Sequence, residues 1–258
     1  MNKVINLISG PRNISTALMY SFAQRGDMMV MDEPFYGYYL SNASLSITHP
    51  SHQEIVDFME CDEQKVVESI QKKRDHNALF IKGMAHHFLS VAPSYLLAWD
   101  NVILIRHPKK LIASFAKVVD NPTLQDIGIK KASELFQYLN ENGESPIVID
   151  SDELMKNPSQ YLQKLCALLQ IPFSQSMLSW QKGGIPQDGI WAKHWYANVH
   201  KTTGFEIQQD KPLEIAPHLG PLLAEAMPYY ELLQQYIFKT INYVANNLTK
   251  AMNIFRFC

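Results

Sequence analysis

Short apolar segments alternate with helix-like segments along most of this chain, and that alternation restricts the fold more than any other feature. Strands are predicted at residues 4–8, 28–31, 79–82, 102–105 and 146–149. Helices are predicted at 15–24, within 53–75, and at 109–119, 130–142, 159–169 and 228–248. Apolar strands that alternate with helices are typical of a parallel sheet covered on both faces. We therefore expect a three-layer α/β/α fold with a central, mostly parallel sheet.

Length and composition fit one domain over residues 1–258, since 47% hydrophobic and 19% charged residues are ordinary for a globular chain. The net charge of −2 argues against a general nucleic-acid binder. No apolar stretch approaches the roughly 18 residues that span a bilayer. Three scattered cysteines, read as reduced, and an N-terminus unlike a signal peptide predict a cytoplasmic location. The oligomeric state is left open.

A tight turn between the first strand and the first helix, Gly10 to Thr16, is the first candidate binding site. Backbone N–H groups at a helix start favour an anion. Arg12 adds full positive charge, and the Ser15 and Thr16 hydroxyls add donors. The Gly-Lys-Ser/Thr ending of a Walker A loop is missing, which argues against Mg-nucleotide hydrolysis. The turn therefore predicts a site for a phosphorylated nucleotide, with a helix N-cap and an exposed arginine as the alternative.

This turn resembles the Pro-Lys/Arg-Ser-Gly-Thr-Thr loop of the P-loop sulfotransferases, which use 3′-phosphoadenylyl sulfate (PAPS). The matching segment is Pro11-Arg12-Asn13-Ile14-Ser15-Thr16. In that family the loop holds the 5′-phosphosulfate, so the resemblance implies a P-loop-type, sulfotransferase-like fold and PAPS contacts at these positions. Asn13 replaces the usual Ser. Ile14 replaces the usual Gly, which lets a backbone approach phosphate closely.

Two further segments are similar to the same family. Arg106-His107-Pro108 with Ser114 matches the strand end and helix whose Arg and Ser bind the 3′-phosphate. The late loop that closes over the nucleotide is matched by Lys182-Gly183-Gly184 and Trp191-Ala192-Lys193-His194. The resemblance therefore implies that the cofactor is also bound by Arg106, Ser114, Lys182, Gly183, Trp191 and Lys193.

Sulfuryl transfer needs a base for the acceptor and positive charge for the leaving phosphate and the sulfuryl oxygens. Glu33, at the end of the second predicted strand, is the first candidate base, because a Glu has this role at a similar place in some family members. His86 and His87 are the alternatives, and Lys82 is a candidate to neutralise the sulfuryl oxygens, as is Arg12. The aromatic run 35–39, together with Trp191, Trp195 and Tyr196, is a candidate to line an acceptor or adenine pocket.

The expected reaction moves a sulfuryl group from PAPS to a hydroxyl or amine of a small-molecule or carbohydrate acceptor and releases adenosine 3′,5′-bisphosphate. No metal is expected, because the sequence has neither HExxH nor a cysteine cluster. Two alternatives stay open. One is a Mg-dependent kinase or nucleoside-triphosphate hydrolase with Asp32 or Asp150 as metal ligand. The other is a catalytically silent nucleotide-binding module, which Ile14 favours.

Overall fold

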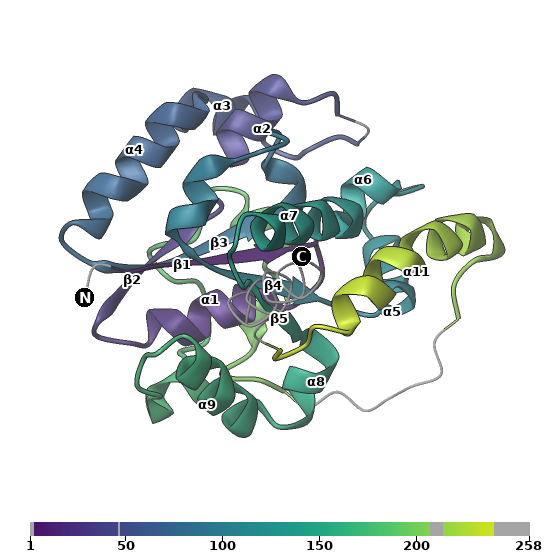
Figure 1. Cartoon of the computed structure of the whole chain (residues 1–258). Coiled ribbons are helices and arrows are strands. Elements are labelled where there is room, and N and C mark those ends of the chain that lie inside the picture. Colours follow the sequence, from purple (N-terminus) through teal and green to yellow (C-terminus); the bar gives the residue numbers. More distant parts are fainter. Residues whose placement is uncertain (1–2, 46, 207–213, 240–258) are drawn as a thin grey trace, which may run out of the picture.

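A computed structural model describes residues 3–45, 47–206 and 214–239. Within these residues five parallel strands form one sheet in the order β2-β3-β1-β4-β5 (Figure 1). The strands are β1 (Val4–Ser9), β2 (Met28–Asp32), β3 (Ala78–Met84), β4 (Asp100–Ile105) and β5 (Ile147–Asp150). In the central register Ile5 lies opposite Phe80 of β3 and Asp100 of β4. The predicted fold class is confirmed.

Helices cover both faces of the sheet. They are α1 (Ser15–Ala23), α2 (Tyr36–Asn42), α3 (His52–Phe58), α4 (Glu63–Arg74), α5 (Pro108–Phe115), α6 (Leu124–Ile127), α7 (Ile129–Glu141), α8 (Ser151–Lys156), α9 (Pro158–Leu168), α10 (Ala192–Trp195) and α11 (Gly220–Gln234). Short 3-10 turns lie at Ala85–His87, Ser94–Ala98, Gln175–Leu178, Val199–Lys201 and Pro217–Leu219.

Alternation along β1 divides the apolar core into two parts. Ile5 and Leu7 belong to the core shared with α1 and α9, whereas Val4 and Ile8 belong to the core shared with α4, α7 and α11. Successive strand side chains point to opposite faces of a sheet, so one buried strand contributes to both cores. Figure 1 shows the two helical layers, with α7 and α11 side by side on one of them.

The helix predicted over residues 228–248 has the wrong bounds. α11 begins at Gly220 and ends at Gln234, and Ile237 then forms a parallel bridge with Val148. Pro228 lies inside the helix instead of at its start, because Ala226 and Tyr230 on either side of it are buried in the core. Residues 240–248 lie outside the described residues. No helix in the described part of the chain is both long and apolar enough to cross a membrane.

All strands end at the same edge of the sheet, because they are parallel. The turn into α1 follows β1, Glu33 follows β2, His86 follows β3, and Arg106 follows β4. Ligands of open parallel sheets bind beyond this carboxyl edge. The fold therefore gathers most of the predicted functional residues in one place.

Candidate active site

One cavity of about 610 Å³ lies at the carboxyl edge of the sheet. It is lined by eleven of the residues predicted to be catalytic or to bind the cofactor: Arg12, Asn13, Ile14, Ser15, Thr16, Glu33, Lys82, His86, His87, Arg106 and Ser114. These residues come from the ends of β1, β2, β3 and β4, from the start of α1 and from α5. The cavity is therefore large enough, and polar enough on one side, for a nucleotide-sized ligand and a small second molecule.

The turn after β1 has an unusual backbone. A Cβ on Gly10 would lie 2.4 Å from the carbonyl oxygen of Ile127, so only glycine fits there. Arg12 and Ile14 adopt a left-handed backbone conformation, with φ of 59° and 60°. A left-handed conformation costs an L-residue about 1–2 kcal/mol, and glycine avoids this cost. Ile14 therefore keeps the conformation that glycine would adopt, and the turn holds strain at the cavity wall.

The two arginines at the ends of β1 and β4 converge. Arg12 Nε donates to Ser114 Oγ at 3.0 Å, and Arg106 Nη1 donates to the carbonyl oxygen of Arg12 at 2.7 Å. Burial and the nearby charge of Arg106 lower the pKa of Arg12. Two like charges held this close, beside the start of α1, favour a bound anion.

The carboxylate of Asp152, at the start of α8, lies between two cationic side chains of this region. Its Oδ1 lies 3.5 Å from Arg106 Nε and 3.5 Å from Lys110 Nζ. All three side chains line the cavity. Sequence reasoning missed Lys110 and Asp152. Lys110 could have been predicted, since it lies one turn after Arg106, on the helix that begins at the same edge of the sheet. The sequence around Asp152 gave no indication that this residue would reach the cavity.

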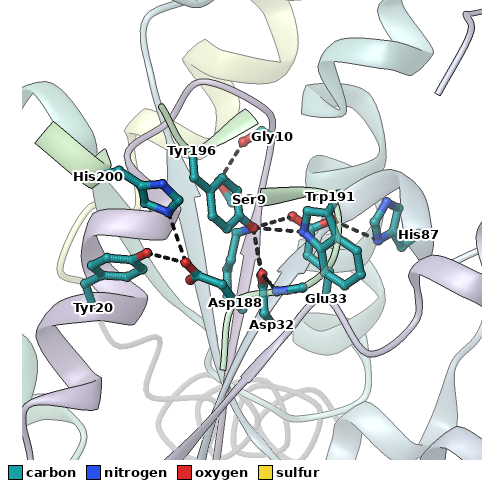
Figure 2. A network of polar contacts seen from close by, with 12 residues as sticks. Ser9, Gly10, Tyr20, Asp32, Glu33, His87, Asp188, Trp191, Tyr196 and His200 are labelled. Atoms are coloured by element: carbon teal, nitrogen blue, oxygen red, sulfur yellow. Dashed lines mark hydrogen bonds and ion pairs between the residues drawn. The ribbon is translucent and has the colours of Figure 1, made fainter. Parts of the chain in front are cut away.

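Lys82 of β3 is buried beside the two carboxylates at the end of β2, Asp32 and Glu33, which are labelled in Figure 2. Its Nζ lies 3.0 Å from Asp32 Oδ1 and also contacts Glu33 Oε1 and the Tyr196 hydroxyl. Burial alone lowers the pKa of Lys82, but the charges of Asp32 and Glu33 outweigh it and raise that pKa. Burial and the neighbouring Asp32 raise the pKa of Glu33. The lysine therefore stays charged and holds the carboxylates together.

The segment after residue 180 is fastened across the end of β2 by the polar network of Figure 2. The Gly189 N–H donates to Asp32 Oδ2 at 3.0 Å, and Trp191 Nε1 donates to the Tyr196 hydroxyl at 3.0 Å. Asp188 accepts from the Tyr20 hydroxyl at 2.6 Å and pairs with His200 Nε2 at 3.0 Å. Tertiary contacts thus decide which part of this segment reaches the cavity.

Four predicted cofactor residues of this segment are not among the residues that line the cavity: Lys182, Gly183, Trp191 and Lys193. Trp191 is buried in the core, and Lys193 pairs with Glu54 at 2.9 Å. The segment instead lines the cavity with later residues, including Trp195, Tyr196 and Phe205.

His87 lies between the carboxylate of Glu33 and two tyrosine rings. Its Nδ1 is 3.9 Å from Glu33 Oε2, and its ring stacks on Tyr36 and Tyr39 with centroids 4.7 and 4.9 Å away. Burial lowers the pKa of His87 well below its usual range and that of the adjacent His86 to about 3. Both imidazoles are therefore neutral near pH 7, and each has a lone pair on one ring nitrogen.

The two aspartates proposed as magnesium ligands both have structural partners. Asp32 is held by Lys82 and Tyr196, and Asp150 caps α8 and accepts from the Tyr230 hydroxyl at 3.1 Å. Among the described residues no group of three or more His, Cys, Asp or Glu side chains is arranged to hold a metal ion.

An all-parallel α/β sheet with paired arginines at its carboxyl edge is an arrangement suited to an anionic ligand at the strand ends. A family model described as a sulfotransferase domain matches residues 2–236. The chain therefore belongs to the sulfotransferase domain family, which confirms the resemblance seen in the sequence.

The chain is also similar to individual proteins and solved structures. The chain is 38% identical over 236 residues to branched-chain-amino-acid aminotransferase-like protein 2 of Arabidopsis thaliana, and the match covers 90% of this chain but only 41% of that protein. The sulfotransferase domain from the curacin biosynthetic pathway has 18% identity and a TM-score of 0.57, with 91% and 98% of the two chains covered. The sulfotransferase from Alicyclobacillus acidocaldarius has 14% identity and a TM-score of 0.51, with 92% and 96% covered. These two structures share the fold.

Proposed function

We propose that this protein is a sulfotransferase that moves the sulfuryl group of PAPS to a hydroxyl or amine acceptor and releases adenosine 3′,5′-bisphosphate. The observation that carries the proposal is the convergence of Arg12, Ser114 and Arg106 on one cavity. Membership of the sulfotransferase domain family supports it. A single domain over residues 1–258 and a cytoplasmic location remain predictions.

The lining of the cavity fits the two charged ends of PAPS. Ser15, Thr16 and the N–H groups at the start of α1 are the donors for the 5′-phosphosulfate, and Arg12 is the adjacent cation. Arg106, Ser114 and Lys110 are the proposed 3′-phosphate group. When bound, PAPS supplies a sulfuryl group whose bond to the phosphate oxygen breaks as its bond to the acceptor forms.

His87 is the proposed base, and Glu33 its positioning residue. Nδ1 of His87 is buried and faces Glu33 Oε2, so the proton is assigned to Nδ1 and the lone pair to Nε2. Nε2 then takes the acceptor proton, and Glu33 stabilises the imidazolium that results. Lys82 shares its charge with Asp32 and Glu33, so in this proposal Arg12 supplies the charge for the sulfuryl oxygens.

Ligand binding tests the nucleotide assignment. Adenosine 3′,5′-bisphosphate is expected to raise the melting temperature, because a ligand that binds only the folded state stabilises it. Arg106→Ala is expected to weaken its binding about tenfold or more while affecting AMP much less, since AMP lacks the 3′-phosphate. Lys72→Ala, an exposed lysine on α4, is the matched control. No thermal shift at millimolar ligand, or equal losses for both nucleotides, contradicts the proposal.

Turnover separates the remaining alternatives. Metal-independent release of adenosine 3′,5′-bisphosphate from PAPS in the presence of an acceptor supports transfer, whereas metal-dependent ATP turnover supports the kinase alternative. Binding with no transfer across a broad acceptor panel supports the silent module. With an active acceptor, His87→Gln is expected to lower kcat by about 100-fold or more. If His87→Gln is active and Glu33→Gln is not, Glu33 itself is the base.

A further inference from the structure

Five aromatic and imidazole rings form one cluster beside Glu33, and this ring cluster makes up the acceptor end of the cavity. Its members are Tyr36, Tyr39, His49, His86 and His87, all of which line the cavity. His87 stacks on both tyrosines, and His86 meets His87 edge to face with centroids 4.7 Å apart and planes at 89°. Because the rings support one another, their orientation is fixed before any acceptor binds.

Two neighbouring imidazoles present one nitrogen each to the cavity. Nδ1 of His86 and of His87 is buried, and neither has a hydrogen-bond partner among the described residues. Both rings line the cavity, so Nε2 is the nitrogen of each ring that we assign to a ligand there. Because the ring centroids are only 4.7 Å apart, two such acceptor nitrogens would suit two hydroxyl groups on neighbouring carbon atoms.

The hydroxyls of the two tyrosines are already engaged. Tyr36 bonds His49 Nδ1 at 2.8 Å, and Tyr39 has a side-chain hydrogen bond to Gln125. Both rings therefore offer mainly apolar surface to an acceptor, and its directional contacts fall to His86 and His87.

The charges that act on the ring cluster are mostly negative. Asp126 interacts electrostatically with Tyr39, His49 and His86, and Glu33 interacts electrostatically with Tyr36. The ammonium group of Lys82 acts on His87, but Lys82 is shared between Asp32 and Glu33. Glu33 and Asp126 both line the cavity, and Lys82 is already paired with Asp32 and Glu33, so a carboxylate or phosphate placed against the rings would be repelled.

We propose that the acceptor is an uncharged compound with two neighbouring hydroxyl groups, such as a polyol or a neutral sugar ring. One hydroxyl loses its proton to His87 Nε2 as the sulfuryl group is transferred, and the other donates a hydrogen bond to His86 Nε2. This inference rests on the proposed sulfotransferase function and names the substrate class of the same site.

Matched probes test it in the whole protein loaded with adenosine 3′,5′-bisphosphate, by ligand-observed NMR. We expect cis-1,2-cyclohexanediol to bind about three- to tenfold more tightly than cyclohexanol, the effect of one neutral hydrogen bond. We expect methyl glucoside to bind at least about tenfold more tightly than methyl glucuronide, which differs by a carboxylate. Equal binding of either pair, tighter binding of the anion, or no binding of any probe overturns the inference.

A variant tests the role of His86 directly. His86→Phe keeps a ring against Tyr39 and removes the nitrogen, so diol binding is expected to fall to the level of cyclohexanol. His76→Phe is the matched control, since His76 is exposed just before β3, at the opposite edge of the sheet. An unchanged diol preference in His86→Phe contradicts the assignment. If the nucleotide itself fails to bind, the proposed function fails instead, so the two failures are distinguishable.

Discussion

Arg12 and Ser114, which lie 102 residues apart in sequence, are joined by a hydrogen bond of 3.0 Å. This bond links the turn after β1 to α5, and the carbonyl oxygen of Arg12 links the same turn to Arg106 after β4. The two proposed phosphate sites are therefore parts of one hydrogen-bonded unit.

Ser114→Ala is expected to weaken binding of adenosine 3′,5′-bisphosphate about tenfold. The substitution removes the partner of Arg12 Nε, and hydrogen bonds to charged groups contribute about 1.5–3 kcal/mol. Calorimetric titration measures the loss. Ser69→Ala, on α4 outside the cavity, is the control and should bind as the native protein does. Native affinity in Ser114→Ala would show that this serine does not hold Arg12 for the ligand.

Asp152→Asn is expected to tighten binding of adenosine 3′,5′-bisphosphate about tenfold, or by about 1.4 kcal/mol. The Asp152 carboxylate lies 3.5 Å from the cations of Arg106 and Lys110, where it competes with a phosphate. The affinity for AMP should change little. Glu153→Gln, one residue along α8, is the control. Weaker binding by Asp152→Asn would mean that Asp152 positions Arg106 instead of competing with the ligand.

Ile14→Gly is expected to be more stable than Ile14→Ala by about 1 kcal/mol. Alanine keeps the strain of a left-handed residue at φ 60°, whereas glycine removes it. At an exposed position inside an ordinary helix, alanine is instead more stable than glycine by about 1 kcal/mol. Lys72→Ala and Lys72→Gly on α4 are the controls that should show this opposite order. Urea unfolding measures both pairs. The same order at both positions would contradict the assigned strain.

Stability is expected to fall as the pH drops from about 6.5 toward 4, in part through His49. Burial lowers the pKa of His49 from 6.5 to about 4. In that window the unfolded chain binds more protons than the folded one, so the free energy of unfolding decreases by up to about 1.4 kcal/mol per pH unit for one such group. Urea unfolding at several pH values should give a shallower decline for His49→Gln. An identical decline in the native protein and in His49→Gln would contradict a contribution of His49 to the pH dependence.

The alternation of apolar strands and amphipathic helices is local, and for that reason the fold class was predictable. The strand predicted at 102–105 is β4 (Asp100–Ile105), and the helix predicted at 130–142 is α7 (Ile129–Glu141). Helix ends were less predictable, because packing decides them. The helix predicted at 109–119 ends at Phe115, and α11 runs through Pro228 where buried neighbours compensate for the missing N–H.

The order of residues along the chain was enough to place Arg12, Glu33, His86 and Arg106 at strand ends, because parallel strands bring their carboxyl ends to one edge. Only the tertiary structure decided which side chains meet there. Tyr196 and Asp32 are 164 residues apart and bond at 2.8 Å, and His49 and Asp152 enter the cavity without any local signal. A sequence pattern reports which face or end a residue occupies, whereas the contacts of its side chain depend on distant segments that the fold packs beside it.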